Sequence, residues 1–134
     1  MYSVIGRIAR AKHERDGDIH IVLDDPDDAS QHIVVELDDP DFRGNTVSPY
    51  RDKLAAARRM LEDLLQRTAG RQLTDLRGAT VRVTGVGFFD MRHFQIGRSR
   101  SCMELHPILG IERVQADSSA RAFLSRAEFA KYGD

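Results

Sequence analysis

The chain has 134 residues, of which 41% are hydrophobic and 31% are charged, as is ordinary for one globular domain with a packed core. Its single cysteine, Cys102, excludes an intrachain disulfide and a cysteine-rich zinc site. Residues 1–6 lack the features of a signal peptide, and no apolar run has the length of a membrane helix. We therefore expect a cytoplasmic protein that does not engage a membrane.

The net charge of −1 conceals an uneven distribution of charge along the chain. Residues 24–41 hold eight acidic side chains and neither lysine nor arginine, whereas residues 42–134 hold 16 basic and 10 acidic side chains. This segregation is compatible with an anionic ligand on the basic side. It is also what solvated surface charge looks like, and composition does not separate the two interpretations.

The first part of the chain predicts three antiparallel strands. Residues 2–13 are rich in aliphatic side chains, with Gly6 as a bulge or close-approach site, and Asp16-Gly17 is a turn signal. Residues 18–24 and 31–37 then alternate between apolar and polar positions on either side of a polar turn at 25–28.

The alternation also predicts how the second and third strands pair. Antiparallel pairing about a centre near Asp28 opposes apolar residues on one face, namely Ile19 with Leu37, Ile21 with Val35 and Leu23 with Ile33. The other face then pairs His20 with Glu36, Val22 with Val34 and Asp24 with His32. A slip of one residue would destroy both patterns, so we expect this register.

The second part predicts a helix, two strands and a final helix. Ser48-Pro49 is a helix start signal, and leucines at helical spacing over residues 49–69 end at Gly70. Residues 79–86 predict a fourth strand, and residues 102–114 predict a fifth that Pro107 interrupts. Residues 118–132 have the spacing of an amphipathic helix.

Three strands, a helix and two strands are the arrangement of the OB-fold, a five-stranded Greek-key barrel. We therefore predict a mainly β protein, an OB-fold-like barrel over residues 1–116 with a helix between its third and fourth strands. The amphipathic helix within residues 117–134 is an addition to the same domain.

Several segments resemble a family of uncharacterised bacterial OB-fold-like proteins. The matching segments are Asp-Gly-Asp-Ile-His-Ile-Val-Leu (16–23), Glu-Leu-Asp-Asp-Pro (36–40), Val-Thr-Gly-Val-Gly-Phe-Phe-Asp (83–90), His-x-Gln-x-Gly (93–97) and Glu-Leu-His-Pro (104–107). The resemblance implies the barrel and a set of polar positions, without an activity. Many relatives are exported, but this chain lacks their signal sequence. It also departs from the family at Phe94 and at Arg98-Ser99-Arg100-Ser101, where the family has a glycine and a neutral run.

Binding of an anionic ligand through residues 88–101 is the first functional hypothesis. Phe88, Phe89 and Phe94 can stack on bases, although the first two can equally close the barrel end. The predicted ligand-binding residues are Arg92, His93, Phe94, Arg98 and Arg100. Single-stranded nucleic acid, an oligosaccharide or a phosphate-bearing ligand would suit these side chains.

A divalent-metal site is the second hypothesis. His20, Glu36, Glu104 and His106 occupy alternating positions on strands, and Asp18, Asp90 and His93 lie at strand ends. The third and fifth strands are neighbours in a barrel of this topology. Two histidines and two carboxylates suit Zn²⁺ or a similar ion, and an open coordination position would permit metal-dependent hydrolysis. The alternative is that His20–Glu36 and Asp24–His32 are ordinary cross-strand pairs.

A third hypothesis is a protein-interaction module in which the C-terminal helix binds a partner or a second copy of the chain. The sequence contains no Ser-His-Asp spacing, phosphate loop or dinucleotide fingerprint. Binding is therefore favoured over catalysis.

Overall fold

The computed structural model describes residues 1–42, 44–89 and 103–115, which contain five strands, an α-helix and a 3-10 helix. The strands are β1 (Tyr2–His13), β2 (Ile19–Asp25), β3 (Asp28–Leu37), β4 (Thr80–Phe89) and β5 (Met103–Arg113). The helices α1 (Arg51–Gln66) and η1 (Leu73–Leu76) lie between β3 and β4 in the sequence. The helix predicted at 118–132 lies outside the described residues.

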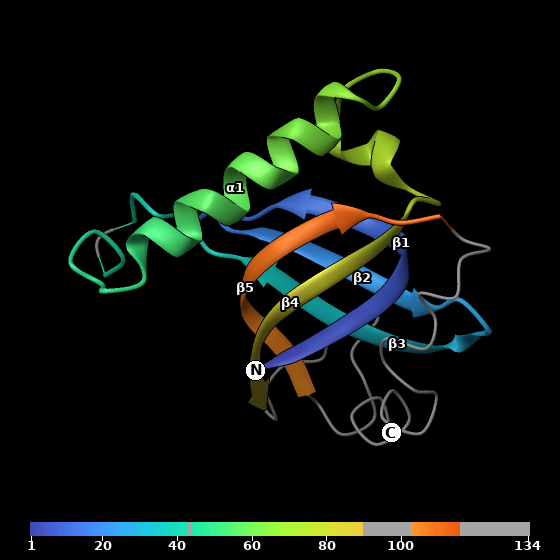
Figure 1. Ribbon diagram of the computed structural model, residues 1–134, viewed down its shortest axis with the longest axis horizontal. Coiled ribbons are helices and arrows are strands. Elements are labelled where there is room, and N and C mark those ends of the chain that lie inside the picture. Colours follow the sequence, from blue (N-terminus) through green and yellow to red (C-terminus); the bar gives the residue numbers. More distant parts are fainter. Residues whose placement is uncertain (43, 90–102, 116–134) are drawn as a thin grey trace.

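The strands close into a barrel in the order β1-β2-β3-β5-β4 (Figure 1). Neighbouring strands are antiparallel except for β3 and β5, which pair in parallel through Val34 with Glu104 and Val35 with Leu105. This order and the helix before β4 confirm the predicted OB-fold-like barrel.

The predicted register of β2 and β3 is confirmed at every pair from Ile19–Leu37 to Asp24–His32. The hairpin end differs from the prediction, because Asp25 pairs with Asp28 and the register shifts between Asp24 and Asp25. The third strand therefore begins at Asp28, earlier than expected. Residues 29–31 form the irregular part of the ladder.

Two other irregularities bend the barrel strands. Gly6 is the predicted close-approach site, since a Cβ there would lie 2.8 Å from Leu23 Cβ, but the bulge in β1 falls between Ile8 and Arg10. On β4 and β5 the register shifts on both sides of Gly85, which lies against Pro107. The predicted interruption at Pro107 is thus a register shift within one continuous strand.

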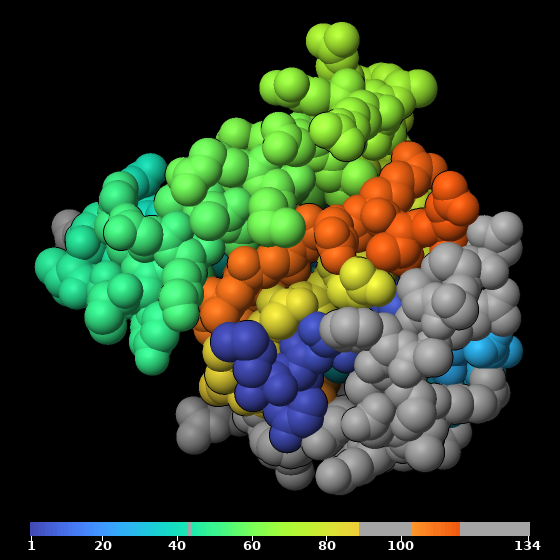
Figure 2. Space-filling view, in the orientation of Figure 1, coloured from blue at the N-terminus to red at the C-terminus, as the bar shows by residue number. Residues whose placement is uncertain are grey.

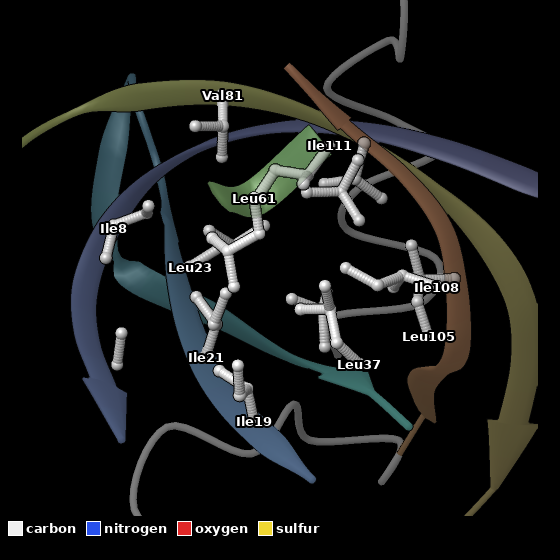
Figure 3. Close-up of a cluster of buried hydrophobic side chains, with 14 of the residues drawn as sticks. Ile8, Ile19, Ile21, Leu23, Leu37, Leu61, Val81, Leu105, Ile108 and Ile111 are labelled. Atoms are coloured by element: carbon white, nitrogen blue, oxygen red, sulfur yellow. The ribbon is translucent and has the colours of Figure 1, made fainter. Parts of the chain in front are cut away.

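The core fills the barrel and extends to α1. Leu61 of the helix lies among barrel side chains that include Leu23, Val81 and Ile111 (Figure 3). The buried helix residues are Leu54, Ala57, Leu61 and Leu64, which form the predicted apolar stripe. The space-filling view shows α1 (green) lying alongside β5 (orange) (Figure 2). The helix thus packs its leucines on the barrel.

The ends of α1 differ from the prediction. The helix starts at Arg51 after Tyr50, two residues beyond Ser48-Pro49, and the Ser48 hydroxyl accepts a hydrogen bond from the Tyr50 backbone N–H at 3.1 Å. It ends at Gln66, and Gly70 (φ +87°) lies in the turn that follows. Within the described ranges, no helix is long and apolar enough to cross a membrane.

Candidate metal centre

Polar side chains from three adjacent strands meet where β2 begins and β3 ends. Asp18 and His20 lie two residues apart at the start of β2, and Glu36 and Asp38 lie two apart at the end of β3. Side chains two residues apart on a strand share a face. The parallel pairing of β3 with β5 adds His106, since Glu36 follows Val34 by two residues just as His106 follows Glu104. One outward-facing cluster results.

Glu36 lies between the two histidines. His20 Nδ1 is 3.0 Å from Glu36 Oε1, as expected for residues directly opposed in the β2–β3 ladder. His106 Nε2 is 3.5 Å from the other oxygen, Glu36 Oε2. The side chains of His20 and Glu36 are only 7% and 14% exposed. The two histidines therefore contact different oxygens of one largely buried carboxylate.

Asp38, Asp18 and His106 form a first candidate group of ligands, which we call the Asp38 group. One ligand atom from each residue lies within 4.8 Å of the others. His106 Nε2 is 2.8 Å from Asp38 Oδ1. His106 and Asp38 therefore form a close, partly buried ion pair.

Glu14, His20 and Glu36 form a second candidate group, which we call the Glu14 group, and their ligand atoms also lie within 4.8 Å of one another. Glu14 comes from the turn between β1 and β2, where its backbone N–H donates to the Asp18 carbonyl at 2.8 Å. Its Oε1 is 3.3 Å from His20 Nδ1. One ring nitrogen of His20 therefore lies close to two carboxylates.

Electrostatics in the cluster shift two pKa values. Burial lowers the pKa of His106, but the hydrogen bond to Asp38 and the charges of Asp38, Glu36 and Glu104 outweigh burial and raise that pKa from 6.5 to about 9. Burial, assisted by the charges of nearby carboxylates, raises the pKa of Asp18 from 3.8 to about 6, although the Asp39 backbone N–H opposes this shift. The negative charges of Asp38, Glu36 and Glu104 around His106 favour a cation at this position.

Glu104 and Phe88 complete the surroundings of His106. Glu104 is 3% exposed and acts on His106 through its charge. The Phe88 ring meets the His106 ring edge to face, with centroids 5.7 Å apart and an interplanar angle of 74°. Phe88 is 46% exposed and pairs with Glu104 across β4 and β5. An aromatic surface thus borders the cluster.

Arg58 of α1 holds together the two segments that carry the aspartates. Its guanidinium donates to the Gly17 carbonyl and to the Leu37 carbonyl, the latter at 3.1 Å. These residues immediately precede Asp18 and Asp38. The Asp39 backbone N–H also donates to Asp18 Oδ1 at 2.8 Å. The helix and the two strands therefore fix the aspartates relative to each other.

Of the predicted metal residues, the structure brings His20, Glu36 and His106 together, with Glu104 close enough to affect the charge of His106. The candidate groups also contain Glu14 and Asp38, which the prediction did not include. Asp38 continues the alternation of Glu36, so the sequence held a signal for it. Glu14 lies in the turn between β1 and β2, so the alternation within the strands gave no signal for it.

The predicted anion-binding residues Arg92, His93, Phe94, Arg98 and Arg100 lie outside the described residues, and so does Asp90, which the metal hypothesis placed at a strand end. The role of this segment therefore stays a prediction, as does that of the C-terminal helix.

The chain was also compared with models of protein families, with curated proteins and with solved structures, and none of them matches.

Proposed function

We propose that the protein binds a divalent first-row transition-metal ion through Asp18, Asp38 and His106. The observation that carries this proposal is the convergence of one ligand atom from each of these side chains, all within 4.8 Å of one another, with His106 Nε2 only 2.8 Å from Asp38 Oδ1. A metal ion among them would replace the His106 proton that now lies between the ring nitrogen and the carboxylate.

The donor set suits this class of ion. One imidazole nitrogen with carboxylate oxygens is typical of Zn²⁺, Mn²⁺, Fe²⁺ or Co²⁺. The Asp39 backbone N–H donates to Asp18, and the Arg58 guanidinium donates to the Leu37 carbonyl next to Asp38. Ligands of metal sites are commonly held in place by such hydrogen bonds. Three protein ligands leave coordination positions for water or an anion, and metal-dependent hydrolysis would use the bound water.

Metal binding to the full chain tests the proposal. Protein freed of metal with a chelator is titrated with Zn²⁺ and Co²⁺, and bound metal is measured after gel filtration. Because Asp38→Asn removes a ligand charge and keeps the shape, we expect it to weaken binding about tenfold or more. Asp41→Asn, at an exposed carboxylate that pairs with Arg51, is the matched control and should bind as the wild type does.

Two results would overturn the proposal. One is the absence of stoichiometric metal in the wild-type chain, which would leave His106–Asp38 as an ordinary ion pair. The other is equal affinity in Asp38→Asn and Asp41→Asn.

We also propose that the predicted anionic ligand would approach this ion. The segment that carries Arg92, Arg98 and Arg100 leaves β4 at Phe89 and enters β5 at Met103, next to Glu104. Salt-dependent binding of single-stranded nucleic acid that Arg98→Ala weakens would support this proposal. Absence of binding at low salt would end it.

A further inference from the structure

The Glu14 group has the contacts of a second ion site. His20 is only 6% exposed. Its Nδ1 lies 3.3 Å from Glu14 Oε1 and 3.0 Å from Glu36 Oε1. One nitrogen carries at most one proton, so it cannot donate a strong hydrogen bond to both carboxylates. A cation among the three side chains would bind all of them at once, in place of the His20–Glu36 hydrogen bond and beside the Lys12–Glu14 ion pair.

Glu36 connects this group to the Asp38 group. Its Oε1 lies against His20 and its Oε2 against His106, so each oxygen is directed to a different group. The strand register produces this arrangement, because β2 and β5 are the two neighbours of β3. A carboxylate that uses its oxygens separately in this way is suited to bridging two ions.

The charges of the cluster agree with two ions. The two groups contain the carboxylates of Glu14, Asp18, Glu36 and Asp38, and Lys12 Nζ reaches the edge of the cluster, 4.0 Å from Glu14. A single divalent ion would leave carboxylates of this partly buried cluster in excess. Glu104, whose charge acts on His106, adds a fifth carboxylate, and two divalent ions together with Lys12 balance the five.

We infer that the protein holds a pair of divalent ions bridged by Glu36, one in the Asp38 group and one in the Glu14 group. This inference rests on the proposed function and extends it from one ion to two. Ions that share a bridging carboxylate lie about 3.5–4 Å apart in proteins, close enough to hold two oxygens of one anion.

Manganese titration of the full chain tests the pair. Metal-free protein is titrated with Mn²⁺ while calorimetry and metal analysis give the stoichiometry and electron paramagnetic resonance reports coupling between ions. We expect two ions per chain with spin coupling. We expect Glu14→Gln to keep the first ion, to weaken the second about tenfold or more, and to abolish the coupling.

Glu62→Gln, at an exposed position of α1, is the matched control and should behave as the wild type. Circular dichroism of each variant checks that the barrel is folded. One ion per chain in both wild type and Glu14→Gln would overturn the pair and leave the proposed function standing. No bound ion would overturn both. Two uncoupled ions, or a second ion unaffected by Glu14→Gln, would overturn the bridge.

Discussion

His106 experiences opposing influences from its surroundings. Burial disfavours its charged form, whereas Asp38, Glu36 and Glu104 favour that form and prevail, so that its pKa rises to about 9. In the metal-free protein the imidazolium offsets part of the negative charge of the cluster. A metal ion must displace this proton, because a coordinating imidazole is neutral.

The stability of the metal-free protein should therefore depend on pH through His106. Its pKa is higher in the folded protein than in the unfolded chain, so its stabilising contribution is complete below pH 6.5 and is lost as the pH rises through 9. Urea unfolding with a chelator, below and above this window, measures the effect. We expect the difference in unfolding free energy between wild type and His106→Gln to shrink at the higher pH.

The raised pKa of Asp18 also makes the stability of the folded protein fall with rising pH, but over a lower pH range. Folded-state protonation is favoured between pH 3.8 and about 6, so stability falls as the pH rises through that range. The two windows allow the two residues to be distinguished. A wild-type–His106→Gln difference that stays constant from pH 6.5 to above 9 would contradict the contribution assigned to His106.

The turn between β1 and β2 supplies two of the cluster carboxylates and depends on Gly17. This glycine has φ +89°, a conformation that other residues rarely adopt. A Cβ at this position would also overlap the Asp39 carboxylate. Because the Asp39 backbone N–H donates to Asp18, the turn couples backbone conformation to the position of a proposed ligand.

Gly17→Ala should therefore destabilise the protein more than Gly78→Ala does. Gly78 has the same φ of +89°, but an added Cβ meets nothing within 4 Å in the described part of the chain, so it serves as the control for backbone strain alone. We expect Gly78→Ala to cost about 1 kcal/mol of unfolding free energy and Gly17→Ala to cost more. Urea denaturation compares the two variants, and equal losses would argue against the overlap with Asp39.

The core joins the barrel and α1 into one cooperative unit. Leu61 of the helix is 1% exposed and packs with the barrel interior, as do Leu23, Val81 and Ile111 (Figure 3). A side chain shared in this way links the stability of the helix to that of all five strands. We expect helix and barrel to unfold together.

Leu61→Ala should lower the unfolding free energy by about 2–5 kcal/mol, because it leaves a cavity in the shared core. Glu62→Ala, at the adjacent exposed position, should change it by less than about 0.5 kcal/mol. Circular dichroism follows the helix and NMR amide signals follow β2 during denaturation. Separate transitions for the two probes would show that the core is not shared.

Alternation in the sequence was sufficient to predict the β2–β3 register, because a shift of one residue would expose Ile21 and Val35. That register also placed His20 opposite Glu36, so half of the candidate site followed from local pattern. The start of α1 was predicted two residues early, since Ser48 bonds the backbone of Tyr50 in the turn before the helix. η1 was not predicted.

The remaining half of the site depended on the pairing of two distant strands and on the conformation of a turn, neither of which the pattern within a single strand contains. The parallel pairing of β3 with β5 brings His106 to Asp38, and the conformation of the β1–β2 turn brings Glu14 to His20. Patterns within single strands determined which side chains share a face. The predicted topology already made the third and fifth strands neighbours, but only the tertiary structure decided their register, which links strands far apart along the chain and brings His106 to Asp38 as well as to Glu36.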